Sequence, residues 1–318
     1  MNAGDIAPEQ LARAWSLYWR SGRLNSCVDG VSESKMLRDA WREFFDRFDS
    51  GTRILDLATG NGAVIDAACA SAVPREARFL LTGVDAAETL QPHNIEAARF
   101  LPGVRMEALP FEAAYFDVVV SQFGFEYGER AACAREAARV LRPGGRLRLV
   151  IHASGGAVHA AAEQSAERLR QALSKRGLLS KLAEFARAEA DHARRLEEQV
   201  AQLWSGLQPA LAGAPSDDAA LFYVRSVTRL WRSRQRYAPD ELSQSIGEAL
   251  DRAQSIFLRQ RAMLQAACSA QDIELLRALL HDADMETSAA DGVFDDAGGQ
   301  LAWIVDGVKK GDAPNNRG

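Results

Sequence analysis

The sequence predicts an α/β protein in which a parallel sheet, wrapped by helices, is interrupted late in the chain by a large helical insertion. From Arg53 to Ile151, short apolar runs rich in β-formers alternate with helical patterns, as crossover helices between parallel strands require. From Ala157 to about Ala283, apolar residues recur at helical spacing among Ala, Leu, Gln, Arg and Glu, which predicts a helical subdomain. Strand character returns over 285–310, where two β-like pieces flank the turn Asp295–Gly299 and predict a closing hairpin.

Each element is predicted from the composition of one run and from the turn residues that bound it. The predicted strands are Arg53–Ala58, Phe79–Asp85, Val104–Ala108, Phe116–Gln122 and Arg146–His152. Helices are predicted between them around Ala63–Ala72, Ala87–Phe100 and Glu129–Leu141. Breaks in the insertion predict helices over about 161–205, 219–236, 240–267 and 271–282, with Gly177 as a further candidate break in the first.

The predicted organisation therefore has five parts. They are an N-terminal helical segment that covers the site (1–50), the sheet core (51–156), a helical lid or substrate subdomain (157–283), the closing β-hairpin of the core (284–310) and a tail (311–318). The tail is predicted to be disordered because polar turn formers dominate it.

Composition places the chain among ordinary globular proteins, with 47% hydrophobic and 25% charged residues in 318. A formal net charge of -5 argues against nucleic acid as the main partner, because duplex binding needs a dense cationic face. The four cysteines form no CxxC pair, and the first residues have no signal-peptide pattern, which predicts reduced thiols in a cytoplasmic protein. No apolar run approaches the ~20 residues of a membrane span, so integral membrane association is not expected.

The clearest motif is the run ILDLATGNGAVID, residues 54–66. A buried strand carries Asp56 and leads into the loop 58–62, here called the glycine loop, with Gly60 and Gly62 ahead of a helix. Glycines let backbone amides approach a nucleoside ligand at the carboxyl edge of a sheet. Ile65 replaces the third glycine of the G-x-G-x-x-G fingerprint, which disfavours a nicotinamide dinucleotide.

This run resembles motif I of class I S-adenosylmethionine (SAM)-dependent methyltransferases, an acid followed by G-x-G-x-G. Asp56 matches the acid and Gly60 and Gly62 the last two glycines, while Ala58 stands in place of the first. Asp85 lies 25 residues past Gly60, at the end of the second strand, where an acid suits ribose hydroxyls. The resemblance implies a Rossmann-like sheet of seven strands, the last antiparallel, with the insertion between strands five and six. It also implies SAM as cofactor and S-adenosylhomocysteine as product.

Three later segments resemble the same family. Residues 107–127 are similar to the EALPF…FDVV stretch of small-molecule methyltransferases of the ubiquinone and menaquinone biosynthesis type, although Arg105 falls where that family has an acid. Residues 138–150 resemble its turn into strand five. The pair of β-like pieces over 285–310, which ends in LAWIVDGVKK, resembles its sixth and seventh strands, the last of them antiparallel. The cofactor residues implied are Asp56, Ala58, Thr59, Gly60, Asn61, Gly62, Asp85, Ala86, Glu107, Ala108, Ser121, Gln122 and Phe123.

Histidine is the residue type best suited to general-base work near neutral pH. His152 ends the fifth strand on the edge that carries the glycine loop, so it is the candidate base; the alternative is a satisfied histidine at a strand end. The five histidines show no metal-ligand spacing, and no metal is expected.

Candidate substrate contacts come from three places. Tyr18, Trp19 and Arg23 lie in an aromatic N-terminal stretch; Glu126, Tyr127 and His159 lie near the ends of strands four and five; Arg225 and Arg229 belong to a helical stripe with Arg232 and Arg236. The alternatives are a hydrophobic face docked on the sheet and, for the arginines, a solvated helix face. Otherwise the stripe would bind a substrate carboxylate or phosphate, an anionic carrier or a membrane surface.

The sequence thus predicts an enzyme of the EC 2.1.1 type, which transfers a methyl group from SAM to an oxygen, nitrogen or carbon atom of a small molecule under a helical lid. One alternative is a SAM-binding scaffold whose insertion makes protein contacts, such as those of a homodimer. A less favoured alternative is an NAD-dependent oxidoreductase.

Overall fold

The computed structural model describes residues 6–24, 35–92, 96, 98–186, 188, 190–213, 218–294 and 298–311. The chain forms two compact units. Trp19–Ala160 and Met263–Gly318 make up the sheet unit, and Met1–Tyr18 and Ala161–Ala262 make up the helical unit.

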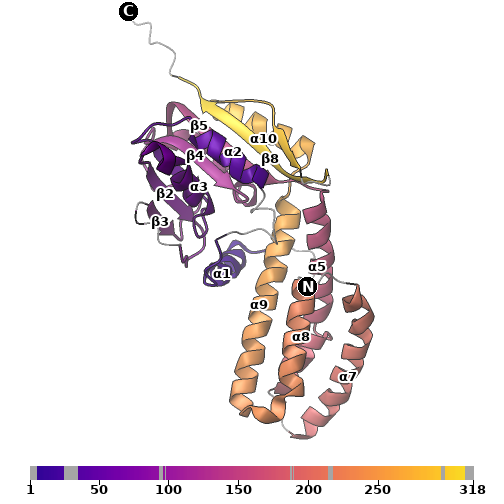
Figure 1. Ribbon diagram of the computed structural model, residues 1–318. Helices are drawn as coiled ribbons and strands as arrows, with labels where there is room; N and C mark the ends of the chain where they lie inside the picture. Colours follow the sequence, from indigo (N-terminus) through magenta and orange to yellow (C-terminus); the bar gives the residue numbers. More distant parts are fainter. Residues whose placement is uncertain are drawn as a thin grey trace, which may run out of the picture. The chain divides into compact units, whose positions relative to one another are not determined.

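The sheet unit is built on an eight-stranded sheet (Figure 1). The strands are β1 Arg53–Leu57, β2 Leu80–Asp85, β3 Ala98–Pro102, β4 Phe116–Gln122, β5 Leu141–His152, β6 Met285–Thr287, β7 Asp291–Phe294 and β8 Gln300–Lys309. Seven of them follow the order β3-β2-β1-β4-β5-β8-β6, and β7 pairs with β8 beside this path. The first five strands are parallel, and β8 lies antiparallel to β5. The predicted fold class is confirmed, with β7 as an additional strand.

Helices cover both faces of this sheet, as Figure 1 shows for α2 and α3 on one face and α10 on the other. The sheet unit contains α2 Lys35–Phe45, α3 Ala63–Ala72, α4 Arg130–Val140 and α10 Ala270–Asp282, with short 3-10 turns at Val73–Arg75 and Phe125–Tyr127. Successive side chains of β1 alternate between the faces: Ile54 packs with α2 and α3, whereas Leu55 packs with α4 and α10. Burial on both faces explains why β1 and β4 read as continuous apolar runs.

The helical unit consists of long helices that pack along one another (Figure 1). They are α5 Ala157–Leu173, α6 Leu178–Ala186, α7 Ala190–Ala212, α8 Ala219–Arg232 and α9 Pro239–Ala266, with α1 Pro8–Trp19 and a 3-10 turn at Arg234–Arg236. Asp218 caps α8 by accepting from the Leu221 amide and forms an ion pair with Arg168 at 2.7 Å. Ser255 donates to the Ala14 carbonyl, which joins α9 to α1. None of the described helices is both long and apolar enough to cross a membrane.

Some predicted elements are wrong. The third strand is β3, not Val104–Ala108, which forms turns. The helix predicted over Ala87–Phe100 overlaps β3 in its last three residues, and its described residues 87–92 are not helical. Gly103 adopts φ +73°, and its amide donates to the Ala87 carbonyl, which ends β3 and turns the chain. The first helix of the insertion is three helices, α5 to α7, and it does break at Gly177, where a Cβ would lie 2.3 Å from a carbonyl oxygen of α5.

Two further segments differ from the predicted organisation. Helix α10 belongs to the sheet unit, where it packs on α4 and β6, and not to the helical insertion. Helix α1 belongs to the helical unit. The antiparallel pair β7 and β8 forms the predicted closing hairpin, whose turn residues 295–297 lie outside the described residues, as does the predicted tail from 312 onwards.

Arg148 joins α2 to the centre of the sheet. Its guanidinium makes two hydrogen bonds to Asp306 on β8, at 2.7 and 2.6 Å, and a third to the Ala40 carbonyl at 2.7 Å. It also lies 4.4 Å from the centre of the Phe44 ring. A planar bidentate donor is required for this set of contacts, which lysine cannot reproduce.

We expect Arg148→Ala to lower the free energy of unfolding by about 3 kcal/mol, because it leaves the Asp306 carboxylate and the half-buried Ala40 carbonyl without their partner. Arg148→Lys should recover less than half of this loss. The matched control is Arg146→Ala, an exposed position two residues earlier on β5, which should cost less than about 0.5 kcal/mol. Urea unfolding measures all three, and equal losses for the two alanine variants would contradict the role of Arg148.

Candidate active site

The glycine loop connects β1 to α3 through three left-handed residues. Ala58, Gly60 and Gly62 have φ of 53°, 54° and 93°, so the chain reverses within five residues and α3 begins at Ala63. Glycine adopts this conformation freely, whereas alanine pays about 1 kcal/mol for it. Ala58 therefore has a glycine-like conformation at the position where the resembling family has glycine.

Close packing around the loop explains how the alanine is accommodated. A Cβ on Gly124, just after β4, would lie 2.3 Å from the Ala58 Cβ, so Gly124 leaves the space that the Ala58 methyl fills. A Cβ on Gly60 would lie 2.4 Å from the Trp19 indole, which packs directly on the loop. Gly83 of β2 makes room for Thr59 in the same way, at 2.6 Å.

Asp85, at the end of β2, is hydrogen-bonded to the glycine loop and to the residues that follow β2. One carboxylate oxygen accepts the Gly60 amide and the other the Ala87 amide, both at 2.8 Å. Burial raises the pKa of Asp85 to about 6, although these two hydrogen bonds favour the ionised form. The predicted ribose acid thus lies against the glycine loop.

Asp56 lies beside Asp85 and is more completely enclosed. Its Oδ2 accepts the Thr59 hydroxyl at 2.6 Å, whereas its buried Oδ1 has no hydrogen-bond partner among the described residues. Burial raises the pKa of Asp56 to about 7, with the charge of Asp85 adding to the effect. Two buried carboxyl groups under one loop favour a ligand that carries positive charge.

Asn61 fastens the N-terminal segment to the glycine loop. Its buried side-chain amide donates to the carbonyls of Trp19 and Arg23, at 3.0 and 2.7 Å, and accepts the Gln91 amide at 2.7 Å. Two predicted substrate residues, Trp19 and Arg23, therefore do lie at the loop. Tyr18 belongs to the helical unit, where the Arg259 guanidinium lies 4.0 Å from its ring centre.

The end of β4 supports the loop from the other side. Ser121 donates to the Leu57 carbonyl of β1 at 2.9 Å. Gln122 accepts from the Trp41 indole of α2 at 2.6 Å, so its side chain serves the packing of α2. Phe123, with φ 55°, turns the chain towards Gly124.

The turn after β3 places Glu107 at the start of α4. Its carboxylate accepts the Glu129 amide at 3.1 Å and lies 3.2 Å from Arg105, the residue that stands in place of the family's acid. Ala108 is exposed, as is Ala86 at the end of β2. The adenine contact of Glu107 and Ala108 stays a prediction.

A buried acid and histidine lie together at the ends of β4 and β5. Glu126, in the 3-10 turn Phe125–Tyr127, has a fully buried side chain. Its Oε1 accepts the His152 backbone amide at 3.0 Å and lies 2.6 Å from His152 Nδ1. The Phe123 and Tyr127 rings lie 4.3 and 6.2 Å from the imidazole. Glu126 and His152 were predicted separately from the sequence. No pattern in the sequence indicates that they pair, or that Gly124 and Gly83 make room for Ala58 and Thr59.

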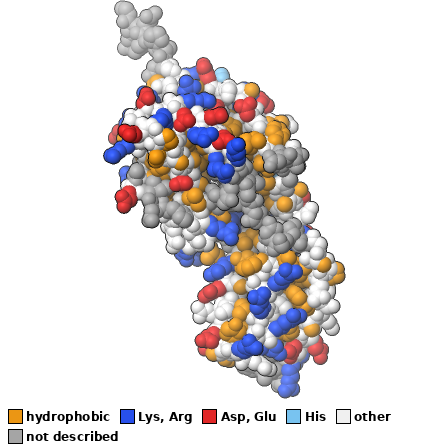
Figure 2. Space-filling view, viewed as in Figure 1, with side chains coloured by type: hydrophobic (Ala, Val, Ile, Leu, Met, Phe, Trp, Pro, Cys, Tyr) orange, Lys and Arg blue, Asp and Glu red, His pale blue; other side chains and the backbone are white. Residues whose placement is uncertain are grey.

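The remaining predicted residues lie on helices α5 and α8. His159 is half-buried on α5, and Arg225 and Arg229 are exposed on α8. Figure 2 shows basic side chains interspersed with hydrophobic ones on this face of the helical unit. His93 lies outside the described residues, and within the described part of the chain no three His, Cys, Asp or Glu side chains form a metal-binding group.

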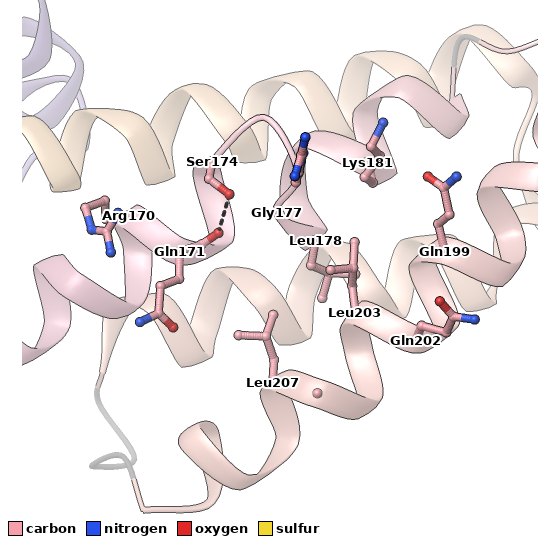
Figure 3. Close-up of a pocket in the computed structure, with 12 residues that line it drawn as sticks. Arg170, Gln171, Ser174, Gly177, Leu178, Lys181, Gln199, Gln202, Leu203 and Leu207 are labelled. Atoms are coloured by element: carbon pink, nitrogen blue, oxygen red, sulfur yellow. Dashed lines mark hydrogen bonds between the residues drawn. The ribbon is translucent and has the colours of Figure 1, made fainter. Parts of the chain in front are cut away.

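The helical unit also contains an open pocket of about 750 Å³ between α5, α6 and α7 (Figure 3). Its floor is apolar, with Leu178, Leu203 and Leu207 pointing into it, and its rim carries Arg170 and Lys181. Both of these cations form ion pairs with nearby glutamates. None of the predicted cofactor residues lines this pocket.

Comparison with known protein families gives one match, which lies within the sheet unit. Residues 55–149, which span β1 to most of β5, match the family model described as a methyltransferase domain. The match confirms the cofactor prediction, SAM with S-adenosylhomocysteine as product. No curated protein matches the sequence.

Solved structures of low sequence identity are similar in fold. The 1,6-didemethyltoxoflavin-N1-methyltransferase of Burkholderia thailandensis, with bound 1,6-didemethyltoxoflavin and S-adenosylhomocysteine, is 13% identical over 98% of this chain and 94% of its own, with a TM-score of 0.48. A SAM-dependent methyltransferase of Methanosarcina mazei is 11% identical over 85% and 98%, with a TM-score of 0.38. One of Thermotoga maritima is 12% identical over 93% and 99%, with a TM-score of 0.40.

The contact between Ala58 and Gly124 can be tested by a double-mutant cycle. We expect Gly124→Ala alone to cost about 2 kcal/mol, because two methyl groups would overlap. Ala58→Gly alone should change the stability by less than about 1 kcal/mol, since relief of the left-handed alanine offsets the added entropy of the unfolded chain. The double variant should regain most of the loss, as measured by urea unfolding. Additive effects would show that the two positions do not share this space.

The raised pKa of Asp56 predicts how stability depends on pH. Its folded pKa of about 7 exceeds the ordinary value of 3.8, so its contribution to stability is fully present below about pH 4 and is lost as the pH rises towards 7. Asp56→Asn keeps an acceptor for Thr59 and removes this loss. Without ligand, the variant should gain about 3 kcal/mol relative to wild type between pH 4 and pH 8.

Thermal unfolding at several pH values measures this difference. Asp66→Asn, at an exposed acid in the first turn of α3, is the matched control and should show no comparable change. A stability difference that is the same at pH 4 and pH 8 for Asp56→Asn would contradict the prediction.

Proposed function

We propose that this chain is a SAM-dependent methyltransferase of the EC 2.1.1 type that methylates a small molecule, with the helical unit selecting the acceptor. The observation that carries the proposal is the arrangement of Asp56, Gly60, Gly62 and Asp85 at the carboxyl edge of the sheet. The match to a methyltransferase domain supports it. The resemblance of residues 107–127 to methyltransferases of the ubiquinone and menaquinone type favours a small acceptor over a macromolecule.

The residues present fit the cofactor. The carboxylate of Asp85 would accept hydrogen bonds from the ribose hydroxyls, and the unpaired Oδ1 of Asp56 would face the positively charged end of the ligand, directly or through water. Gly60 and Gly62 bring backbone amides close without a side chain in between. SAM supplies a methyl group on a sulfonium, which is a good leaving group.

With such a donor, the protein's main task is alignment of the acceptor and exclusion of water. Alignment alone can lower the barrier by roughly 7 to 11 kcal/mol. The absence of a catalytic triad from the sequence is therefore compatible with an enzyme. The helical insertion follows β5 directly in the chain, and we propose that it acts as the lid. A cytoplasmic location and a homodimer stay predictions.

Calorimetry with SAM and S-adenosylhomocysteine tests the cofactor site. Wild type should bind both, and Asp85→Asn should bind at least tenfold more weakly, because the uncharged amide offers one oxygen acceptor where the carboxylate offers two. Wild-type affinity should also fall as the pH drops below about 6, where Asp85 takes up a proton. Asp66→Asn serves again as the matched control.

Each alternative has its own outcome in this experiment. Unchanged SAM affinity in Asp85→Asn would overturn the site. Binding of NAD with no binding of SAM would favour an oxidoreductase. Tight SAM binding with no release of S-adenosylhomocysteine in cell extract would favour a scaffold.

A further inference from the structure

We propose that the pocket between α5, α6 and α7 binds an amphiphilic organic acid, a molecule with an apolar body and a carboxylate at one end. The described residues that line this pocket, here called the helical pocket, all lie between Arg170 and Leu207, within the helical unit. None of the proposed cofactor residues is among them. This site is therefore additional to the proposed cofactor site, and its existence does not depend on methyl transfer.

The helical pocket has the size and the floor that a small organic molecule needs. Its volume of about 750 Å³ falls within the range of roughly 300 to 1,000 Å³ that is usual for such sites. Leu178, Leu203 and Leu207 point into it (Figure 3). Leu203 and Leu207 are only partly buried, so an apolar ligand that covered them would remove apolar surface from water. The floor thus favours the apolar part of a ligand.

Gly206 keeps the α7 side of the pocket open. It lies in the interior of α7, where glycine is less favourable for a helix than alanine. A Cβ at Gly206 would meet no atom of the described residues within 4 Å, so packing within the protein does not require glycine here. The missing side chain leaves space on α7 beside Leu203 and Leu207, which a ligand can fill.

Positive charge gathers on one side of the pocket. The described residues that line it include Arg170, Arg176 and Lys181 but no acid. These three cations come from α5, α6 and the turn that joins them, whereas α7 contributes the uncharged amides of Gln199 and Gln202 (Figure 3). A cleft that carries one sign of charge attracts a ligand of the opposite sign. Because the cations lie on one side only, the complementary ligand has its negative charge at one end.

Arg176 is the cation with the most capacity for a carboxylate. It is exposed in the turn between α5 and α6 and has no ion-pair or hydrogen-bond partner in the described part of the chain. A guanidinium matches the two oxygens of a carboxylate with parallel N–H donors. Arg176 is therefore the expected partner of the ligand's acid group.

The other two cations are paired, but only weakly. Arg170 forms an ion pair with Glu167, whose side chain is 48% exposed. Lys181 forms one with Glu184, whose side chain is 41% exposed. Water screens pairs that are exposed to this extent, so either cation can turn to a ligand without leaving a buried charge behind. Both thus add to the attraction of an anion.

Calorimetry on the full chain with octanoate tests the site, and octan-1-ol is the uncharged probe of the same chain length. Wild type should bind octanoate at least tenfold more tightly than octan-1-ol, because only the acid makes charge-assisted hydrogen bonds to the cations. No binding of octanoate at millimolar concentration, or equal affinity for the two probes, overturns the proposal. SAM is left out, so the result is independent of cofactor binding.

A charge substitution tests the expected carboxylate partner. Arg176→Gln should weaken octanoate binding at least fivefold and leave octan-1-ol binding unchanged. Arg194→Gln is the matched control, because Arg194 is an exposed arginine of α7 that does not line the pocket. Equal weakening in the two variants would mean that octanoate responds to the general charge of the helical unit, and the proposal would be wrong.

A substitution that fills the pocket locates the bound ligand. Gly206→Leu should abolish binding of both probes, and leucine favours the helix more than glycine does. Gly247→Leu is the matched control, since Gly247 lies within α9, outside the pocket lining, and a Cβ there also meets no atom within 4 Å. Gly206→Ala, a smaller filling, should weaken binding in part and takes the place of Gly206→Leu if the latter does not fold.

Two results of this substitution would overturn the proposal. Wild-type octanoate affinity in Gly206→Leu, with unchanged helix content by circular dichroism, would mean that the ligand lies elsewhere. A dimer in sedimentation velocity that Gly206→Leu dissociates, with no octanoate binding by wild type, would assign the pocket to a second copy of the chain.

Discussion

The hydrogen bond from the Gly60 amide to the Asp85 carboxylate ties the glycine loop to the end of β2, and the geometry of the whole edge depends on it. The same loop is bonded to β2 by the Thr59 amide, which donates to the Val84 carbonyl at 2.9 Å. With the loop held in this way, Gly60 presents a flat surface to Trp19, and Asn61 points towards the N-terminal segment. The loop that we propose as the cofactor site is therefore also the anchor of residues 19–23.

Three buried carboxyl groups lie at the carboxyl edge of the sheet, where we propose the active site. Asp56, Asp85 and Glu126 are all enclosed, and Asp56 and Glu126 each leave one oxygen without a hydrogen-bond partner among the described residues. Asp306, on the same sheet, uses both of its oxygens on Arg148. Asp85 likewise uses both of its oxygens, on the Gly60 and Ala87 amides, so among these acids only Asp56 and Glu126 have an oxygen without a partner in the described part of the chain. This contrast supports assigning chemistry to the edge.

The sequence predicted the centre of the sheet well and its periphery poorly, for a physical reason. Strands β1 and β4 are buried on both faces and so show unbroken apolar runs. Strand β3 lies at the edge of the sheet, is half-exposed and ends in Pro102, so its signal is weak. The alternating run Val104–Ala108 was the more strand-like of the two. An amphipathic pattern likewise predicted the helix α10. It did not indicate that α10 packs on α4 and β6 in the sheet unit.

The part of the candidate site that lies in one continuous segment could be predicted from the sequence. The part that depends on contact between residues of two different strands could not. Asp56, Gly60 and Gly62 lie within seven residues, and their spacing alone indicated a nucleoside site. Glu126 and His152 are 26 residues apart. Their contact depends on the pairing of Gln122 with Val150 and on the 3-10 turn after β4. A change of one residue in that register would turn His152 to the other face of the sheet.

Two physical constraints favour glycine in the loop: a left-handed backbone and close packing. The two constraints act at different positions. Gly62 has a left-handed backbone, which an alanine at Ala58 also tolerates, so conformation alone does not require glycine at every such position. Gly60 has a second constraint, because a side chain there would collide with the Trp19 ring. The requirement at Gly60 thus comes from packing of the N-terminal segment, in addition to the ligand approach that we propose. A motif that is usually explained by the cofactor alone is, in this chain, also a contact within the fold.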